Sequence, residues 1–104
     1  MLRQFDVFPN RNPRTRDTHP FFIVLQSDVL ESLNTRIVAP LFPANSPSRG
    51  ERLMPVVTVS GARYMIDTSN MGAIPVKAAA QPVANLESER YRLIAAIDLV
   101  FTGI

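Results

Sequence analysis

The chain has 104 residues, of which 46% are apolar and 19% are charged, and this is the size and composition of a single folded domain spanning residues 1–104. It contains no cysteine, which excludes disulfides, thiolate metal sites and a cysteine nucleophile. Its net charge is only +2, from 11 basic and nine acidic residues, which is too small for nucleic-acid binding driven by global charge.

The first ten residues, MLRQFDVFPN, mix charged residues with a few apolar ones, unlike a signal peptide. No run approaches the roughly 18 apolar residues that a membrane-spanning helix needs. We therefore expect a cytoplasmic protein that makes no membrane contact. Within this segment, residues 3–8 alternate between apolar and polar side chains, which predicts a strand.

Three arginines follow in 11-RNPRTRD-17, here called the arginine loop. Its prolines, asparagine and aspartate favour turns over helix or strand, so an exposed loop is expected. Two interpretations remain open: a solvated hairpin tip, or a surface for an anionic partner such as an acidic peptide or a phosphate backbone. The only histidine, His19, comes next, and a surface or turn position is expected for it.

Strand patterns dominate the middle of the chain, at residues 21–27, 36–42, 53–59, 63–69 and 74–78. Pro40 lies inside the second of these segments and predicts a sheet edge or a bulge there. Residues 43–52, rich in Pro, Ser, Asn and Gly, predict a second loop. Ser60, Gly61 and Ala62 separate the third and fourth segments, which predicts a hairpin.

The pattern changes to a helical one at Asn85, a favourable N-cap residue that is followed by acidic residues in the first turn. Apolar side chains then recur every three or four residues, which predicts a helix from Asn85 to the last residue, Ile104. Residues 93–101 are apolar nearly all round, so a second surface besides one sheet must cover them. Asp98 interrupts this stretch. Because a buried unpaired carboxylate is costly, we expect it at an exposed rim rather than in a buried pair.

Recognisable catalytic motifs are absent from the sequence. There is no local Ser, His and acid constellation and no glycine-rich phosphate loop, and one histidine without cysteines makes a weak metal site. No catalytic residue, metal ligand or cofactor is therefore predicted. A ribonuclease site built from Arg, Thr and Asp remains open, since such a site needs no visible motif.

Four segments in order, 24–41, 53–59, 71–76 and 95–104, resemble the CcdB family of bacterial toxins. The most specific elements are Gln26-Ser27-Asp28, Pro40-Leu41, Ile74-Pro75-Val76 and Gly103-Ile104. The resemblance spans nearly the whole chain. It implies a mainly β fold, an SH3-like barrel with a C-terminal α-helix, which the family shares with MazF and Kid type endoribonucleases. It also implies a homodimer.

The resemblance further implies a function in a type II toxin–antitoxin system. Such a toxin binds the A subunit of DNA gyrase and traps the cleaved DNA complex, so it is a topoisomerase inhibitor rather than an enzyme. A CcdA-like antitoxin neutralises it through a disordered acidic segment, and the pair represses its own operon, so contact with DNA is indirect. By position, the implied gyrase-binding residues are Ser27, Val29, Asp98, Thr102, Gly103 and Ile104. An acidic antitoxin segment would suit Arg11, Arg14, Arg16, Arg49 and Arg52.

Two positions depart from the family pattern. Thr102 stands where the family has a tryptophan that stacks on gyrase, and Asp98 stands where an asparagine is common. The shared fold and the lost aromatic side chain, respectively, keep two other functions open. One is a MazF-like endoribonuclease on the same fold, and the other is a decayed toxin that acts only as an antitoxin-binding co-repressor.

Overall fold

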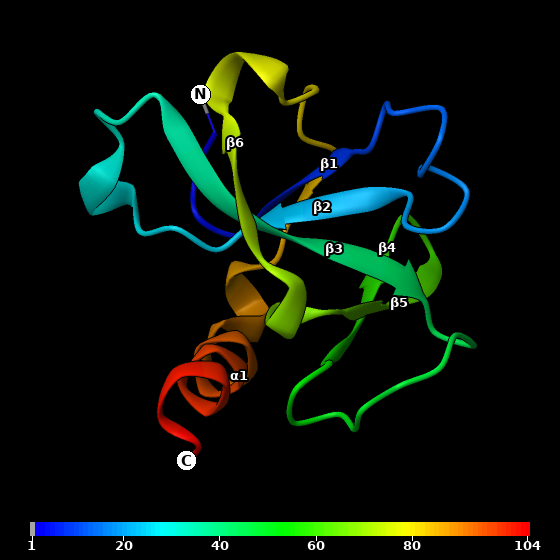
Figure 1. The fold of residues 1–104 in the computed structure, drawn as a ribbon. Helices are drawn as coiled ribbons and strands as arrows, with labels where there is room; N and C mark the ends of the chain where they lie inside the picture. Colours follow the sequence, from blue (N-terminus) through cyan, green and yellow to red (C-terminus); the bar gives the residue numbers. More distant parts are fainter. Residues whose placement is uncertain (1) are drawn as a thin grey trace.

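The computed structural model describes residues 2–104, which form a mainly β structure with one long C-terminal helix (Figure 1). The strands among these residues are β1 (Asp6–Pro9), β2 (Phe21–Val24), β3 (Thr35–Pro43), β4 (Val56–Val59), β5 (Ala62–Ile66), β6 (Gly72–Pro75) and β7 (Ala84–Asn85). Short 3-10 turns are η1 (Asp28–Leu30), η2 (Thr68–Asn70), η3 (Val76–Ala78) and η4 (Glu87–Glu89), and the α-helix is α1 (Arg90–Thr102). No helix in residues 2–104 is long and apolar enough to cross a bilayer.

All seven strands belong to one antiparallel sheet, in which six follow the order β4-β5-β3-β2-β1-β7 and β6 pairs with β3 outside this order. The long strand β3 is central, because β2 pairs with one of its edges while β6 and β5 share the other. The sheet curls into a nearly closed barrel, and α1 extends away from it to the C-terminus (Figure 1). The expected SH3-like barrel with a C-terminal helix is therefore confirmed.

Pro40 explains why one edge of β3 has two partners. Leu41 pairs with Ile66 of β5, so the next residue along, Asp67, lies opposite Pro40. The Asp67 N–H donates to the Pro40 carbonyl at 2.9 Å, but proline has no N–H to return the bond. The Asp67 carbonyl instead accepts from Asn70 N–H at 3.1 Å, which starts η2. The pairing with β5 ends there, and the chain returns as β6 along the first half of β3.

The structure therefore corrects the expectation that Pro40 marks a sheet edge or a bulge. The proline lies inside the most central strand, at the point where the partner of β3 changes from β6 to β5. Only the local ladder is interrupted there, so β3 keeps its pairing with β2 through Phe22.

The predicted hairpin is confirmed as β4–β5, with a loop of two residues. Ser60 and Gly61 have φ values of 51° and 82°, the positive values at both loop positions that a type I′ hairpin turn requires. Ala62 already belongs to β5, where it pairs with Val59. The strand predicted from residue 53 begins only at Val56, because residues 51–54 form turns that lead into it.

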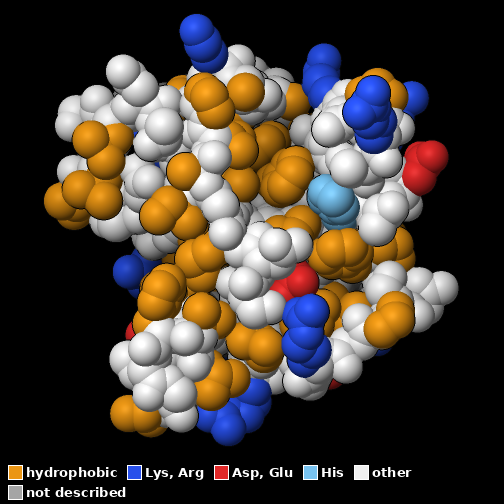
Figure 2. All heavy atoms as spheres, viewed as in Figure 1, with side chains coloured by type: hydrophobic (Ala, Val, Ile, Leu, Met, Phe, Trp, Pro, Cys, Tyr) orange, Lys and Arg blue, Asp and Glu red, His pale blue; other side chains and the backbone are white. Residues whose placement is uncertain are grey.

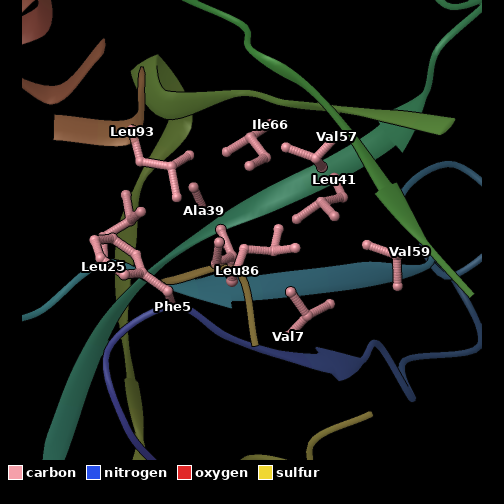
Figure 3. Packing of buried hydrophobic residues seen from close by; sticks show 11 residues of the cluster. Phe5, Val7, Leu25, Ala39, Leu41, Val57, Val59, Ile66, Leu86 and Leu93 are labelled. Atoms are coloured by element: carbon pink, nitrogen blue, oxygen red, sulfur yellow. The ribbon is translucent and has the colours of Figure 1, made fainter. Parts of the chain in front are cut away.

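The larger of two hydrophobic clusters fills the barrel between the sheet and the helix (Figure 3). Its buried members are Phe5, Val7, Ile23, Leu25, Ala39, Leu41, Val57, Val59, Ile66, Leu86 and Leu93. Helix α1 buries Leu93 and Ala96 completely, while Ile94 and Ile97 are only partly buried against the core. The helix thus closes one side of the barrel with a narrow stripe, and much of its apolar surface is left uncovered by this chain.

The predicted helix boundaries need correction at both ends. Asn85 belongs to β7, and its Oδ1 accepts from the Glu87 N–H at 2.9 Å, so it bonds to the first residue of the 3-10 turn η4 and not to the α-helix, which starts at Arg90. At the other end, Gly103 has a φ of 75° and its N–H donates to the Leu99 carbonyl at 3.1 Å. A left-handed glycine of this kind ends a helix, so Ile104 lies beyond it.

Candidate functional site

The end of α1 carries apolar side chains that nothing in this chain covers. Phe101 is 70% exposed and Ile104 is 83% exposed. Asp98 is exposed on the same helix, as predicted. Hydrophobic side chains reach the surface at this corner of the molecule (Figure 2). An apolar end of this kind is a candidate contact surface for another protein. Phe101 was not among the predicted contact residues, although an aromatic side chain just before Thr102 was a signal available in the sequence.

Thr102 is tied to its own helix. Its hydroxyl donates to the backbone carbonyl oxygen of Asp98 at 2.7 Å. This bond across one helical turn satisfies the hydroxyl locally, so the side chain does not need a partner for its polar atom. The tail Thr102–Gly103–Ile104 is exposed throughout.

The second part of the predicted gyrase surface lies on η1. Ser27 caps this turn, because its Oγ accepts from the Val29 N–H at 3.2 Å. Val29 projects from the turn and is 88% exposed. The hydrogen bonds and ion pairs recorded for residues 2–104 do not join η1 to the tail. The predicted residues therefore lie on two elements, η1 and the end of α1.

The arginine loop is an ordered turn structure. Asn10 is buried, and its Nδ2 donates to Thr15 Oγ1 and to the His19 carbonyl, both at 2.9 Å. Its Oδ1 accepts from the Asn12 N–H at 3.0 Å. These bonds hold the loop together from within and leave its arginines exposed, namely Arg11, Arg14 and Arg16. Within residues 2–104, none of the three takes part in an ion pair.

The two arginines predicted in the second loop differ from each other. Arg49 Nη1 lies 3.3 Å from Asp67 Oδ1 and donates to Ser69 Oγ at 3.0 Å, and the Asp67 side chain is only 7% exposed. Arg49 therefore neutralises a buried carboxylate. Arg52 is exposed, and no acidic partner for it is recorded in the described part of the chain.

A pocket of about 490 Å³ separates the two loops, and no sequence pattern predicted it. Apolar side chains such as Phe42, Pro47 and Met54 line it together with Asp17 from the arginine loop and the Arg49–Asp67 pair. The pocket therefore brings the arginine loop close to Arg49. Its lining contains two carboxylates and one arginine, so it does not favour an anion.

His19 lies beside this pocket and is more buried than a surface histidine. Its ring centroid is 5.5 Å from that of Phe22 and 5.4 Å from that of Phe42. Nδ1 is buried without a hydrogen-bond partner in residues 2–104. Burial lowers the pKa of His19 from its ordinary value of 6.5, because desolvation disfavours the charged ring. The predicted loop position is confirmed, but the ring packs between aromatic side chains.

Solved structures with this architecture include bacterial toxins. The Mycobacterium tuberculosis toxin MazF-mt6 is 20% identical over 95% of this chain and 96% of its own, with a TM-score of 0.69. A crystal structure of an Mtb toxin is 23% identical over 80% of this chain and 92% of its own, with a TM-score of 0.65. At these identities the likeness concerns the fold alone. The family model described as CcdB protein matches residues 4–103, nearly the whole chain, and the chain therefore belongs to the CcdB family.

Proposed function

We propose that this chain is the toxin of a type II toxin–antitoxin system that binds the A subunit of DNA gyrase and traps the gyrase–DNA cleavage complex. Membership of the CcdB family supports the toxin role. The single observation that carries the gyrase part is the uncovered apolar end of α1, where Phe101 and Ile104 are 70% and 83% exposed. Protein–protein affinity is concentrated in a few such side chains at the centre of an interface.

In this proposal the contact surface combines the tail with η1. Thr102, Gly103 and Ile104 enter gyrase, Asp98 meets a basic rim on the target, and Phe101 supplies the aromatic contact that Thr102 does not. Val29 and Ser27 form the second contact. A homodimer presents two copies of this surface, and the partly buried helix residues Ile94 and Ile97 leave apolar surface for a second copy to cover.

The proposed antitoxin site is the arginine loop with its neighbours in the second loop. Arg11, Arg14 and Arg16 are exposed and unpaired within the described residues, so a disordered acidic segment of a CcdA-like antitoxin finds free donors there. Arg52 extends this surface. Arg49 is a weaker candidate, because it would have to leave Asp67 or share it. The complex then binds operon DNA through the antitoxin, which makes the toxin a co-repressor.

A MazF-like endoribonuclease is the second candidate, and one observation favours it. His19, Arg49 and Asp67 lie in or beside the same pocket, and these residue types serve in acid–base chemistry on RNA. The fold likeness to the M. tuberculosis toxin MazF-mt6 is compatible with this chemistry. The excess of carboxylate over arginine in the pocket weighs against binding a phosphodiester, so we place this function second.

The third candidate, a decayed toxin that acts only as an antitoxin-binding co-repressor, depends on Thr102. It keeps the arginine loop surface and loses gyrase binding. A gyrase assay separates it from the leading proposal.

The deciding experiment is a supercoiling and DNA-cleavage assay of purified gyrase with the full chain, beside a variant that lacks residues 102–104. We expect the full chain to accumulate cleaved DNA and the shortened one to lose this activity while remaining folded. A folded full chain that leaves gyrase untouched would contradict the gyrase proposal. RNA cleavage by that same preparation, abolished in Asp67→Asn, would then favour the endoribonuclease, and antitoxin binding without either activity would favour the co-repressor.

A further inference from the structure

A tight turn near the start of the chain, residues 3–6, makes hydrogen bonds to the η1 region and to the start of α1, the two elements that carry the proposed gyrase surface. On the side of η1, the Gln4 backbone N–H donates to Asp28 Oδ1 at 2.8 Å. The Gln4 side-chain Nε2 donates to the Leu25 carbonyl at 3.1 Å. These two bonds hold both ends of the segment that carries Ser27.

On the side of the helix, the same residue accepts two hydrogen bonds. Asn85 Nδ2 donates to the Gln4 carbonyl at 3.1 Å. Arg90 Nη1 donates to Gln4 Oε1 at 3.1 Å, and Arg90 is the first residue of α1. The side-chain amide of Gln4 therefore bonds in two directions. Its nitrogen donates to Leu25, just before η1, and its oxygen accepts from Arg90 of α1.

The neighbouring residue, Phe5, repeats this cross-connection in the core. Its N–H donates to the Val24 carbonyl at 2.7 Å, and its carbonyl accepts from the Leu86 N–H at 2.9 Å. Phe5 has a φ of 69° and is completely buried. A bulky residue adopts this left-handed conformation only where the surroundings impose it. The guanidinium of Arg90 also lies 5.5 Å from the centre of the Phe5 ring.

We propose that Gln4 is a positioning residue that fixes η1 relative to α1, so that Val29 and the tail are presented to gyrase together. The inference rests on the proposed function, because it concerns the same surface. Val29 and the tail project from different elements and share no hydrogen bond, so their relative placement depends on what connects those elements. A partner that contacts both projections binds more tightly when they are already held in place, because less freedom is lost on binding.

The test is the variant Gln4→Ala, which removes both side-chain bonds and leaves the backbone bonds in place. The matched control is Gln81→Ala, the same chemical change at an exposed glutamine for which no side-chain hydrogen bond is recorded in residues 2–104. We expect Gln4→Ala to need roughly 2- to 30-fold more protein for half-maximal gyrase inhibition. Antitoxin affinity should remain within about twofold, and Gln81→Ala should match the parent in both assays.

A double-mutant cycle with Val29→Ala distinguishes positioning from a general loss of stability. If Gln4 acts by placing η1, its replacement costs less in a chain that already lacks the Val29 side chain, so the two effects are not additive. Full additivity, or unchanged inhibition by a folded Gln4→Ala protein, would overturn the proposal. Should Gln4→Ala fail to fold, Arg90→Met takes its place in the same cycle, because it removes the donor to Gln4 Oε1 and keeps an apolar side chain near Phe5.

Amide hydrogen exchange supplies a reading that does not involve gyrase. In Gln4→Ala the amides of Leu30 and Glu31, which close η1, should exchange faster, while those in the middle of α1 keep the rates of the parent. Unchanged exchange in η1 would refute the positioning role even if gyrase is the target. Faster exchange in η1 with a parent protein that does not inhibit gyrase would support the positioning role and refute the proposed function.

Discussion

The hydroxyl of Thr102 donates a 2.7 Å hydrogen bond to the backbone carbonyl oxygen of Asp98, one helical turn earlier. The polar atom at the position of the family's tryptophan is therefore already satisfied by the helix. Replacing Thr102 by tryptophan should restore an aromatic anchor and strengthen gyrase inhibition by up to about thirtyfold, or about 2 kcal/mol. Titration of gyrase supercoiling activity measures this change.

Thr102→Val is the control for that prediction, because it keeps the shape of threonine and removes only the bond to Asp98. Its inhibition should stay close to that of the parent. If tryptophan at position 102 weakens inhibition, the surface does not receive an aromatic side chain there, and Thr102 makes contacts of its own.

Phe101 should be a major contact although it contributes little to folding. Because 70% of its side chain is exposed, Phe101→Ala should lower the free energy of unfolding of the monomer by less than about 1 kcal/mol. It should weaken gyrase inhibition about tenfold or more, as expected for an aromatic side chain at an interface centre. Denaturant unfolding measures the stability, gyrase titration measures the inhibition, and light scattering measures the oligomeric state. A shift from dimer to monomer in Phe101→Ala would instead assign this ring to the contact between copies.

Removal of the three arginines of the arginine loop should affect the antitoxin alone. The triple change Arg11→Ala, Arg14→Ala and Arg16→Ala should weaken antitoxin binding by about 1 to 3 kcal/mol in total and reduce its dependence on salt. Gyrase inhibition should be unchanged. Calorimetric titration at two salt concentrations measures both effects, with Arg63→Ala as an exposed control on β5. Equal antitoxin affinities in the parent and the triple variant would exclude the loop from this site.

Arg49 should matter for stability because it faces a buried carboxylate. Arg49→Ala leaves Asp67 with Ser69 as its side-chain partner, and it should destabilise the fold by about 1 to 3 kcal/mol. The further change Asp67→Asn should recover part of this loss, since it removes the buried charge. Denaturant unfolding of the single and double variants tests the pair, with exposed Arg52→Ala as a control expected to change stability by less than about 0.5 kcal/mol.

His19 should make the fold less stable in mild acid. Its pKa in the folded chain is lowered by burial, so below pH 6.5 the unfolded chain binds a proton that the folded chain resists. Its contribution to stability is fully present above pH 6.5 and is lost as the pH falls toward the folded pKa. His19→Phe keeps an aromatic ring between Phe22 and Phe42 and removes the titration. The free energy of unfolding should then fall less between pH 7 and 5.5 than it does in the parent, and equal slopes would refute this cause.

Local patterns in the sequence predicted much of the fold, because the spacing of apolar residues and the residue types of turns are local properties. The strand segments, the Ser60–Gly61 hairpin and the C-terminal helix all follow from such patterns. The exact start of the helix could not be predicted in this way, because Asn85 is a favourable N-cap residue and yet pairs with Asp6 in the sheet. A short strand of two residues leaves no periodic signal. The split edge of β3 also depends on which strands meet at Pro40, which is a matter of tertiary structure.

The candidate site was harder to predict from the sequence than the fold, because a contact residue must be exposed and exposure depends on the tertiary structure. The exposed position predicted for Asp98 follows from the cost of burying a carboxylate, whereas the exposure of Phe101 contradicts the usual tendency of aromatic residues to be buried. The pairing of Arg49 with Asp67 joins the second loop to the residue just before η2, and no spacing rule predicts such a contact. The buried ring of His19 likewise depends on Phe42, which only the folded sheet brings near.

The missing N–H of Pro40 affects the ion pair between Asp67 and Arg49. Any other residue at that position would offer a second donor to the Asp67 carbonyl, in competition with Asn70, which closes η2. Continued pairing would draw residues 67–69 into the strand and away from the turn in which Ser69 Oγ donates to Asp67 Oδ1 at 2.7 Å. The carboxylate would then lose the geometry in which Arg49 meets it. An uncharged residue in the middle of the sheet thus helps to keep Asp67 in the turn where it is the counter-ion of Arg49 in the second loop.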